Sequence, residues 1–123
     1  MDINQLATVE KHEVGAELHL VDPVTGEKED ALFRVKGTDS KAWRDALKDQ
    51  RRKYADQEEM DFFDHEYLSP MVAKIIIGWE GLAKDGEPWE YSEENAMFLC
   101  ENSPIVVNQI FAFIVNRENF TGG

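Results

Sequence analysis

Cysteine is scarce in this chain, and positive charge is scarce relative to negative charge. Its 123 residues include one cysteine, Cys100, so an internal disulfide is excluded and a reducing compartment is expected. Only 13 lysines and arginines stand against 25 aspartates and glutamates, which gives a net charge of −12. Because phosphate groups are bound by positive charge, this balance argues against nucleic-acid binding and against docking on anionic membranes.

Long apolar runs and secretion signals are also missing. No apolar stretch approaches the roughly 18 residues that a membrane-spanning helix needs, and the first residues lack the basic and apolar regions of a signal peptide. We therefore expect a soluble protein of the cytoplasm with no membrane partner. At this length, and with 42% hydrophobic residues, one domain spanning residues 1–123 is expected.

The residue patterns of enzymes and metal sites are absent as well. The sequence has no Gly-x-Ser-x-Gly motif, no phosphate-binding glycine loop, and no cysteine with a plausible histidine and asparagine. The acidic stretch 56–66 lacks the residue order and the glycine of an EF-hand, and His65 has no second histidine at helical spacing. We predict a protein that is not an enzyme and needs no cofactor or metal.

The first third of the chain favours β-structure. Residues 2–13 show weak periodicity and are expected to form a loose entry segment. Residues 14–21 and 31–36 alternate apolar and polar side chains, as half-buried strands do, with a turn signal between them. We predict a β-hairpin in a layer of residues 1–38, which packs on a helical core of residues 39–123 because an isolated hairpin is only marginally stable.

Four serines predict the helices of this core. A serine side chain caps the first turn of a helix, and proline is favoured directly after the cap because its missing N–H costs nothing there. The predicted helices cover residues 40–54, 70–82, 93–102 and 104–116, after Ser40, Ser69, Ser92 and Ser103. The first carries six basic residues, which form either a solvated face or a docking face for an acidic partner. The fold class is α+β and mainly α, an N-terminal β-hairpin followed by about four helices.

Trp79 and Tyr91 are expected to form one structural unit. Trp79 ends the apolar stripe of the helix 70–82, and the turn Asp85-Gly86 reverses the chain. Tyr91 stands directly before the Ser92 cap, where an aromatic ring packs on the first turn of the helix. The sequence therefore predicts that the two rings lie close together.

One run of residues carries a family resemblance. It contains Gly78-Trp-Glu-Gly-Leu82, then Asp85-Gly86, then Tyr91-Ser-Glu-Glu-Asn-Ala96, followed by Pro104 and Asn119-Phe120. In this run the chain resembles the tail assembly chaperone family of long-tailed bacteriophages. The motif residues are Trp79, Gly81, Gly86, Tyr91, Ser92 and Asn95.

The resemblance implies a non-enzymatic, mainly helical protein of the host cell cytoplasm. Such proteins coat the long, helical tape-measure protein, keep it soluble, help to recruit major tail protein, and are absent from the mature virion. The implied partners are therefore these two tail proteins. Grooves between apolar helices are surfaces that receive amphipathic helices, and an excess of negative charge keeps such a complex in solution.

The most apolar predicted helices, 70–82 and 104–116, supply more apolar surface than one small core encloses. Because an uncovered apolar groove would aggregate, we expect a homo-oligomer in which client binding and self-association share a surface. That surface is expected to carry some of Ile77, Ile110, Phe111, Phe113 and Ile114.

A second hypothesis also accounts for the charge. A small acidic protein can mimic the phosphate surface of DNA and inhibit a host DNA-binding protein. Against this alternative, the acids are spread evenly along the sequence rather than paired in a stripe, and the basic helix 40–54 interrupts the mimicry. The chaperone is therefore the first hypothesis and the DNA mimic the second.

Overall fold

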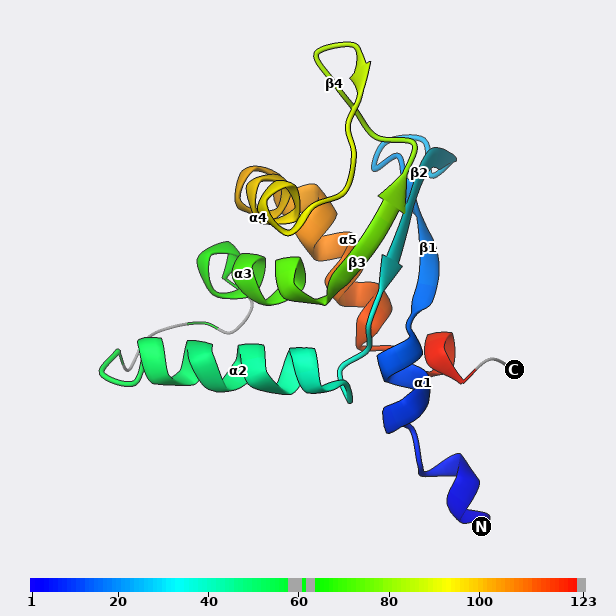
Figure 1. Ribbon diagram of the computed structural model, residues 1–123, viewed down its shortest axis with the longest axis vertical. Helices are drawn as coiled ribbons and strands as arrows, with labels where there is room; N and C mark the ends of the chain where they lie inside the picture. The colour runs from blue at the N-terminus through cyan, green and yellow to red at the C-terminus, as the bar shows by residue number, and fades with distance from the viewer. Residues whose placement is uncertain (58–60, 62–63, 122–123) are drawn as a thin grey trace.

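A β-hairpin opens the body of the protein, as the alternating pattern predicts. The computed structural model describes residues 1–57, 61 and 64–121 (Figure 1). Its first strands are β1 (Ala16–Val21) and β2 (Lys28–Val35), which pair antiparallel. On the face predicted to be apolar, Leu18 and Phe33 are buried in the core.

α3 (His65–Ile75) begins earlier than the sequence predicts. The expected cap was Ser69 followed by Pro70, but the Asp64 carboxylate caps the helix by accepting the Glu66 N–H at 3.1 Å. Ser69 is buried within the helix instead, and Pro70 lies inside it. Aspartate is as good an N-cap as serine, so the predicted start at Ser69 was wrong.

β3 (Ile76–Glu80) replaces the second half of the predicted helix 70–82, which is a correction to the sequence analysis. The β-branched run Ile75-Ile-Ile77 and the following Gly78 have weak helix preference. Antiparallel pairing with the open edge of β2 then favours a strand, a tertiary effect that no local pattern displays. β3 thereby joins the predicted helical core to the hairpin in one sheet of order β1-β2-β3.

Three other helices have the serine caps that the sequence predicts. In each of them the serine Oγ accepts a backbone N–H from the first turn. They are α2 (Lys41–Lys53) after Ser40, α4 (Glu93–Asn102) after Ser92, and α5 (Pro104–Ile114) after Ser103. Among the described residues, no single helix has both the length and the apolar character to cross a membrane; α4 and α5 reach that standard only as a pair bent by 107°.

Residues 2–13 are more ordered than the loose segment predicted for them. They contain the 3-10 helix η1 (Ile3–Gln5) and most of α1 (Val9–Val14). Near the other end of the chain lies η2 (Arg117–Phe120), close to α1 (Figure 1). Helices this short have too few turns for an apolar periodicity to be recognised in the sequence.

A small second hairpin projects from the body. β4 (Ala83–Lys84) and β5 (Glu87–Pro88) pair around Asp85-Gly86, where the sequence predicts a turn. Figure 1 shows this hairpin at the top of the molecule, at a distance from α2. It links the end of β3 to the start of α4.

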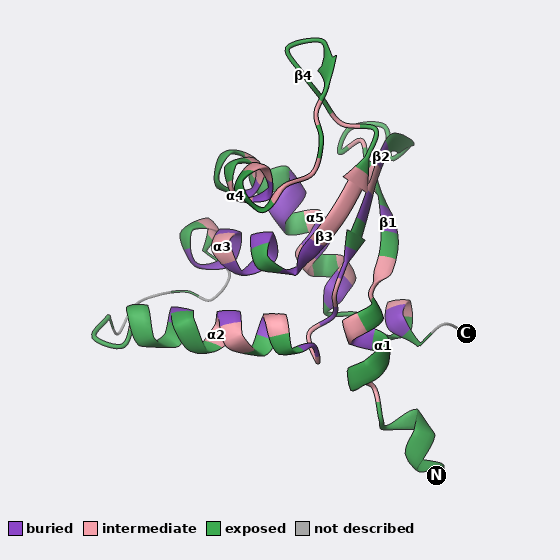
Figure 2. Cartoon of the chain, viewed as in Figure 1, coloured by how far each residue is buried: buried purple, intermediate pink, exposed green. Residues whose placement is uncertain are grey.

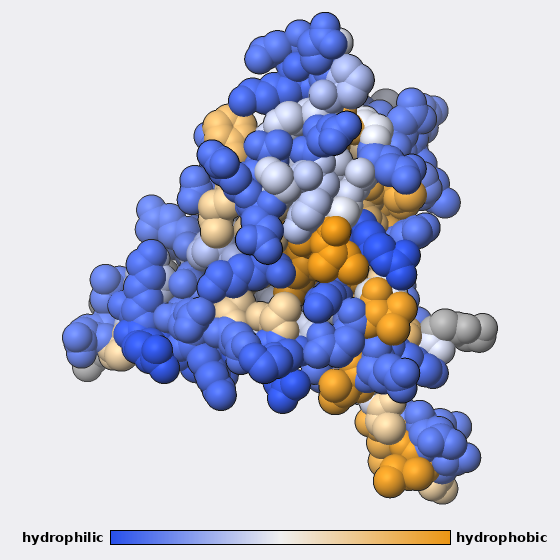
Figure 3. Space-filling view, viewed as in Figure 1, coloured by the Kyte–Doolittle hydropathy of each residue, from blue (hydrophilic) through white to orange (hydrophobic). Residues whose placement is uncertain are grey.

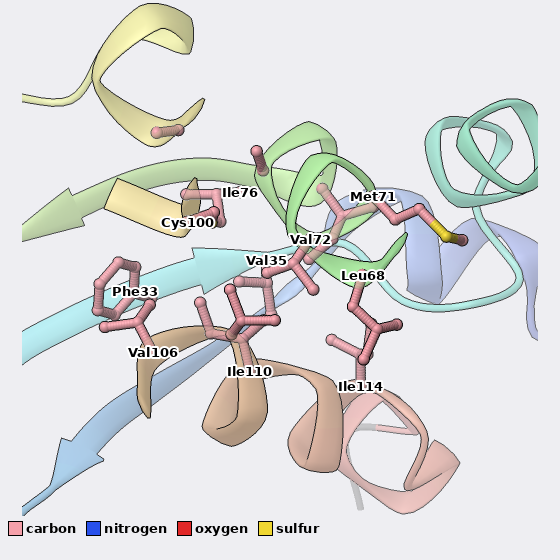
Figure 4. Packing of buried hydrophobic residues seen from close by; sticks show 14 of the residues in the cluster. Phe33, Val35, Leu68, Met71, Val72, Ile76, Cys100, Val106, Ile110 and Ile114 are labelled. Carbon is pink, nitrogen blue, oxygen red and sulfur yellow. The ribbon is translucent and has the colours of Figure 1, made fainter. Parts of the chain in front are cut away.

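The hydrophobic core lies between the inner face of the sheet and the helices α3, α4 and α5. Figure 4 shows Phe33 and Val35 of β2 on the same side as Val106 and Ile110 of α5, with Val72 of α3 beside them. Figure 2 shows the buried residues gathered on α3, α5 and the strands, whereas η1 is exposed. The fold class is the predicted one, α+β with an N-terminal hairpin in one compact domain.

Candidate functional site

An aromatic cluster, formed by Trp79, Trp89, Tyr91 and Phe98, joins β3 to the segment that follows it. The ring centroid of Trp79 lies 5.1 Å from that of Trp89 and 5.3 Å from that of Tyr91. The Trp79 Nε1–H donates to the Trp89 carbonyl at 2.7 Å, and the Tyr91 hydroxyl donates to the Ile76 carbonyl at 2.9 Å. Trp79 and Tyr91 therefore do lie together, although Trp79 comes from a strand and not from a helix.

The motif glycines Gly81 and Gly86 both stand where the backbone has positive φ. At Gly81, with φ +80°, an added Cβ would lie 2.5 Å from the carbonyl oxygen of Asp30, near the start of β2. At Gly86, with φ +83°, the space is open, and only the conformation favours glycine. Because Asp85 also has a positive φ of 54°, the two residues form the tight turn that suits a two-residue hairpin.

Ser92 and Asn95 fix the start of α4. The Ser92 Oγ accepts the Asn95 N–H at 3.0 Å, and the Asn95 side chain donates to the Glu90 carbonyl at 2.9 Å. With Trp79, Tyr91 and the two glycines, these residues hold the connection from β3 through the β4–β5 hairpin into α4. The contacts of the six motif residues are thus contacts that maintain local structure.

A wide groove, called here the β1–α5 groove, runs between β1 and α5. It has a volume of about 670 Å³, and its apolar lining includes Leu18, Pro23 and Phe113. Gln109 of α5 also lines it, and the Gln109 amide bonds to both the N–H and the carbonyl of Val21, at 2.9 Å and 2.7 Å. An added strand would have to bind these same backbone groups of Val21, which the amide already occupies. This end of the groove therefore suits a helix better than a strand.

A narrower cleft of about 380 Å³ lies between β3, α3 and α4. Ile77 and Met97 contribute apolar surface to it, and Tyr91 forms part of its wall. Two lysines line it as well: Lys36, which pairs with a carboxylate of α1 at 3.6 Å, and Lys74, which pairs with a carboxylate of α2 at 3.0 Å. Both lysine charges are therefore already balanced within the protein.

The predicted client or self-association surface needs a correction. Ile110 and Ile114 are 0% exposed, because the helical period of 3.6 residues turns them with the rest of their face into the core (Figure 4). They therefore cannot form an accessible surface. The other three predicted residues are half-buried: Ile77 lines the cleft, Phe113 lines the β1–α5 groove, and Phe111 stacks on a tryptophan of α2.

A polar cluster of Thr8, His12, Asp39 and Arg117, called here the terminal latch, ties both ends of the chain to the start of α2. The Asp39 carboxylate accepts two hydrogen bonds from Arg117, at 2.9 and 3.1 Å, and one from the Thr8 hydroxyl. His12 is 0% exposed, its Nδ1 accepts the Asp39 N–H at 3.0 Å, and its ring stacks on Phe120 at 4.6 Å.

The terminal latch has a defined charge state. The hydrogen bonds from Arg117 lower the pKa of Asp39 to about 2, so its carboxylate is ionised at neutral pH. Burial is the largest influence on His12, and it lowers the pKa of this imidazole below its usual value of 6.5. At neutral pH His12 is therefore neutral while Asp39 is charged.

The described residues offer little for catalysis or metal binding. Among them, no group of three or more His, Cys, Asp and Glu side chains is placed to hold a metal ion. Part of the predicted stretch 56–66, namely residues 58–60, 62 and 63, lies outside the described residues. Burial raises the pKa of the Cys100 thiol to about 12, which disfavours the nucleophilic thiolate.

Sequence reasoning did not single out Trp89, Phe98 or the terminal latch. For the two rings a signal was available, because residues 79–98 contain four aromatic side chains. For the latch there was none, since Asp39 and Arg117 are 78 positions apart and each is an ordinary surface residue type.

Comparison with known protein families places the chain in a family. A family model described as YdaY prophage protein matches residues 38–121, from the loop before α2 to the end of η2. No curated protein and no solved structure matches the chain. The matched range includes the aromatic cluster and α5 but leaves out β1 and β2.

Proposed function

We propose that this chain, which belongs to the YdaY prophage protein family and is thus phage-derived, is a tail assembly chaperone. It binds the tape-measure protein, keeps it soluble and helps to recruit major tail protein. The observation that supports this function is the β1–α5 groove. An open groove with a mainly apolar lining accepts the apolar face of an amphipathic helix, and a long helical client offers many such faces.

The charge of the chain also supports this role. A chaperone that gathers apolar helices must stay in solution while they are bound, and a net charge of −12 provides repulsion between complexes. We place the protein in the host cell cytoplasm, acting without catalysis or cofactor, and leaving the tail before the virion is complete.

Self-association is part of this proposal. Large apolar side chains are exposed on the first residues and on α1, and Figure 3 shows apolar surface over this part of the molecule. They are Met1, Ile3, Leu6, Val9 and Val14. Exposed apolar side chains gathered in one place are typical of a contact surface, which supports a homo-oligomer.

The test is co-expression with fragments of the tape-measure protein from the same prophage. Ala112→Arg places a charge in the β1–α5 groove at an exposed helical position, without removing a buried side chain. The matched control is Val24→Arg, at a 90% exposed position that does not line the groove. The amount of soluble fragment should be high with the parent and the control, and low with Ala112→Arg.

Two results would contradict this function. One is a parent protein that leaves the fragments insoluble. The other is an Ala112→Arg variant that keeps them as soluble as the parent does. If the parent instead captures a nuclease or a repressor and no tail protein, the DNA mimic becomes the better explanation of the charge.

A further inference from the structure

Around the aromatic cluster, residues 80–94 carry far more negative than positive charge. Lys84 is the only basic residue there, so six negative charges and one positive charge leave a net charge of −5. All six carboxylates are exposed, and none of them forms an ion pair with any residue that the structure describes. They are Glu80, Asp85, Glu87, Glu90, Glu93 and Glu94.

The same region presents aromatic rings to solvent. Phe98 is 46% exposed, and its ring meets Trp89 edge-on at 6.0 Å. Trp89 and Trp79 are half-buried, and Phe33 of the core supports Trp79 at 5.8 Å. The cluster is therefore anchored from beneath by the core and fixed by the Trp79 Nε1–H bond, so its outer rings are held in place before any partner arrives.

Lys84 indicates which chemistry these rings accept. Its ammonium nitrogen lies 4.4 Å from the ring centroid of Phe98 and 5.7 Å from that of Trp89. A cation within about 6 Å of an aromatic centroid is attracted by the negative face of the ring. Because Lys84 is exposed and stands beside the tight turn of the small hairpin, an incoming cation can displace it.

We propose that the aromatic cluster and its surrounding carboxylates form a docking surface for a cationic amphipathic helix of a partner protein. A lysine or arginine of that helix takes the place of Lys84 over Phe98 and Trp89, while its apolar residues contact the exposed parts of the rings. The charge of −5 on residues 80–94 supplies the complementary field. The identity of the partner as tape-measure protein rests on the proposed function, whereas the chemistry of the surface does not.

This docking surface is separate from the β1–α5 groove. The aromatic cluster lies beside β3, the groove lies beside β1, and these strands are the opposite edges of the sheet. The groove accepts apolar side chains, and the docking surface selects for positive charge. A change at one edge therefore leaves the other intact.

The first experiment uses two synthetic peptides of about 18 residues, five turns of helix. Both carry leucine on one face; the opposite face carries arginine in the probe and glutamine in the matched peptide. Binding is followed by NMR through the indole N–H signals of Trp43, Trp79 and Trp89. The arginine peptide should shift the Trp89 signal, leave the buried Trp43 signal in place, and bind on the order of tenfold more tightly than the glutamine peptide.

The second experiment changes the charge of the protein. Removing the internal cation with Lys84→Gln should tighten binding of the arginine peptide about two- to fivefold. The double variant Glu87→Gln/Glu90→Gln should weaken it about three- to tenfold at low salt. Glu10→Gln/Glu118→Gln is the control, because it removes the same charge from exposed positions on α1 and η2 and should change nothing.

Equal affinity for the two peptides would overturn the docking surface, and so would weaker binding by Lys84→Gln. The two proposals fail in different ways. Peptide discrimination without solubilised tape-measure fragments contradicts only the chaperone function. Solubilised fragments with no discrimination between the peptides contradict only the docking surface.

Discussion

The two edges of the sheet are protected by the same device but leave different surfaces. At the β1 edge, the Gln109 amide bonds to both backbone groups of Val21. At the β3 edge, the Tyr91 hydroxyl bonds to the Ile76 carbonyl. In both places a side chain from a later segment occupies backbone groups that would otherwise invite another strand.

What lies beside each edge is different. The β1 edge borders a mainly apolar groove, and the β3 edge borders aromatic rings among exposed carboxylates. Binding at the first depends on shape and apolar contact, and binding at the second depends on charge. Salt should therefore weaken only the second, because ions screen exposed charges and do not weaken apolar burial.

The largest loss of stability is expected when the Trp79 ring, which supports the β3 edge, is removed. Trp79→Ala takes away a ring that contacts Phe33, Trp89 and Tyr91, and should lower the free energy of unfolding by about 3 kcal/mol. Trp79→Phe keeps a ring but loses the Nε1–H bond, and should lower it by about 1 kcal/mol. Urea denaturation measures both. A Trp79→Ala variant as stable as the parent would mean that the β3 edge does not depend on this ring.

Gly81, directly after β3, and Gly86, in the turn between β4 and β5, allow a sharper test. Gly81→Ala introduces both a strained φ and a Cβ against the Asp30 carbonyl, so it should destabilise the protein by about 2 kcal/mol. Gly86→Ala introduces only the strained φ, because the space there is open, and should cost about 1 kcal/mol. Thermal melts compare the two. If Gly86→Ala lowers the stability more than Gly81→Ala does, then contact with β2 is not what favours glycine at position 81.

Removing the two protecting side chains compares the edges directly. Tyr91→Phe leaves the carbonyl of the buried Ile76 without its partner and should cost about 1 to 2 kcal/mol. Gln109→Leu should cost about 0.5 to 1 kcal/mol, because Val21 is exposed and water replaces the amide. Denaturant titration gives the stabilities, and light scattering tests whether either edge now pairs with another molecule. If Tyr91→Phe and Gln109→Leu lower the stability equally, the expected difference between the buried Ile76 carbonyl and the exposed backbone of Val21 is wrong.

The last test concerns the terminal latch, which lies apart from the cleft and the groove. The pKa of His12 is lowered in the folded protein, so unfolding takes up a proton below pH 6.5 and stability falls as the pH drops below that value. The loss is at most about 1.4 kcal/mol per pH unit for one proton. The contribution of Asp39, whose pKa is lowered to about 2, persists until the pH falls below 3.8.

Urea denaturation at several pH values between 7.5 and 5 measures this dependence. The His12→Gln variant should remove the part of the slope that appears below pH 6.5. A slope that is unchanged in the variant would assign the dependence to other groups. Peptide discrimination at the β3 edge should stay the same in parent and variant, because the latch contributes no residue to the aromatic cluster.

Local sequence patterns predicted the strands and helices whose conformation depends mainly on neighbouring residues. The hairpin was found because its side chains alternate, and three helices were found because Ser40, Ser92 and Ser103 accept first-turn N–H groups. β3 was missed because its strand conformation depends on pairing with β2, more than forty positions earlier in the chain. The start of α3 was misplaced because Asp64 and Ser69 are both acceptable caps.

The candidate surfaces were predicted less well than the fold. Apolar periodicity identified α5 as a helix with too many apolar residues, but it did not say which face meets the sheet. Ile110 and Ile114 were therefore assigned to a surface, although they are buried. Phe113 lines the β1–α5 groove, and its role in binding a client or a second copy stays a prediction. The choice of face depends on where the neighbouring elements lie.

The terminal latch joins segments that the ribosome makes far apart in time. Asp39 receives two hydrogen bonds from Arg117, and the ring that stacks on His12 belongs to Phe120. Until Arg117 and Phe120 have been made, Asp39 lacks its arginine and His12 lacks the ring that stacks on it. α1 is therefore synthesised more than a hundred residues before the ring that covers its histidine, and its final packing waits for that later segment.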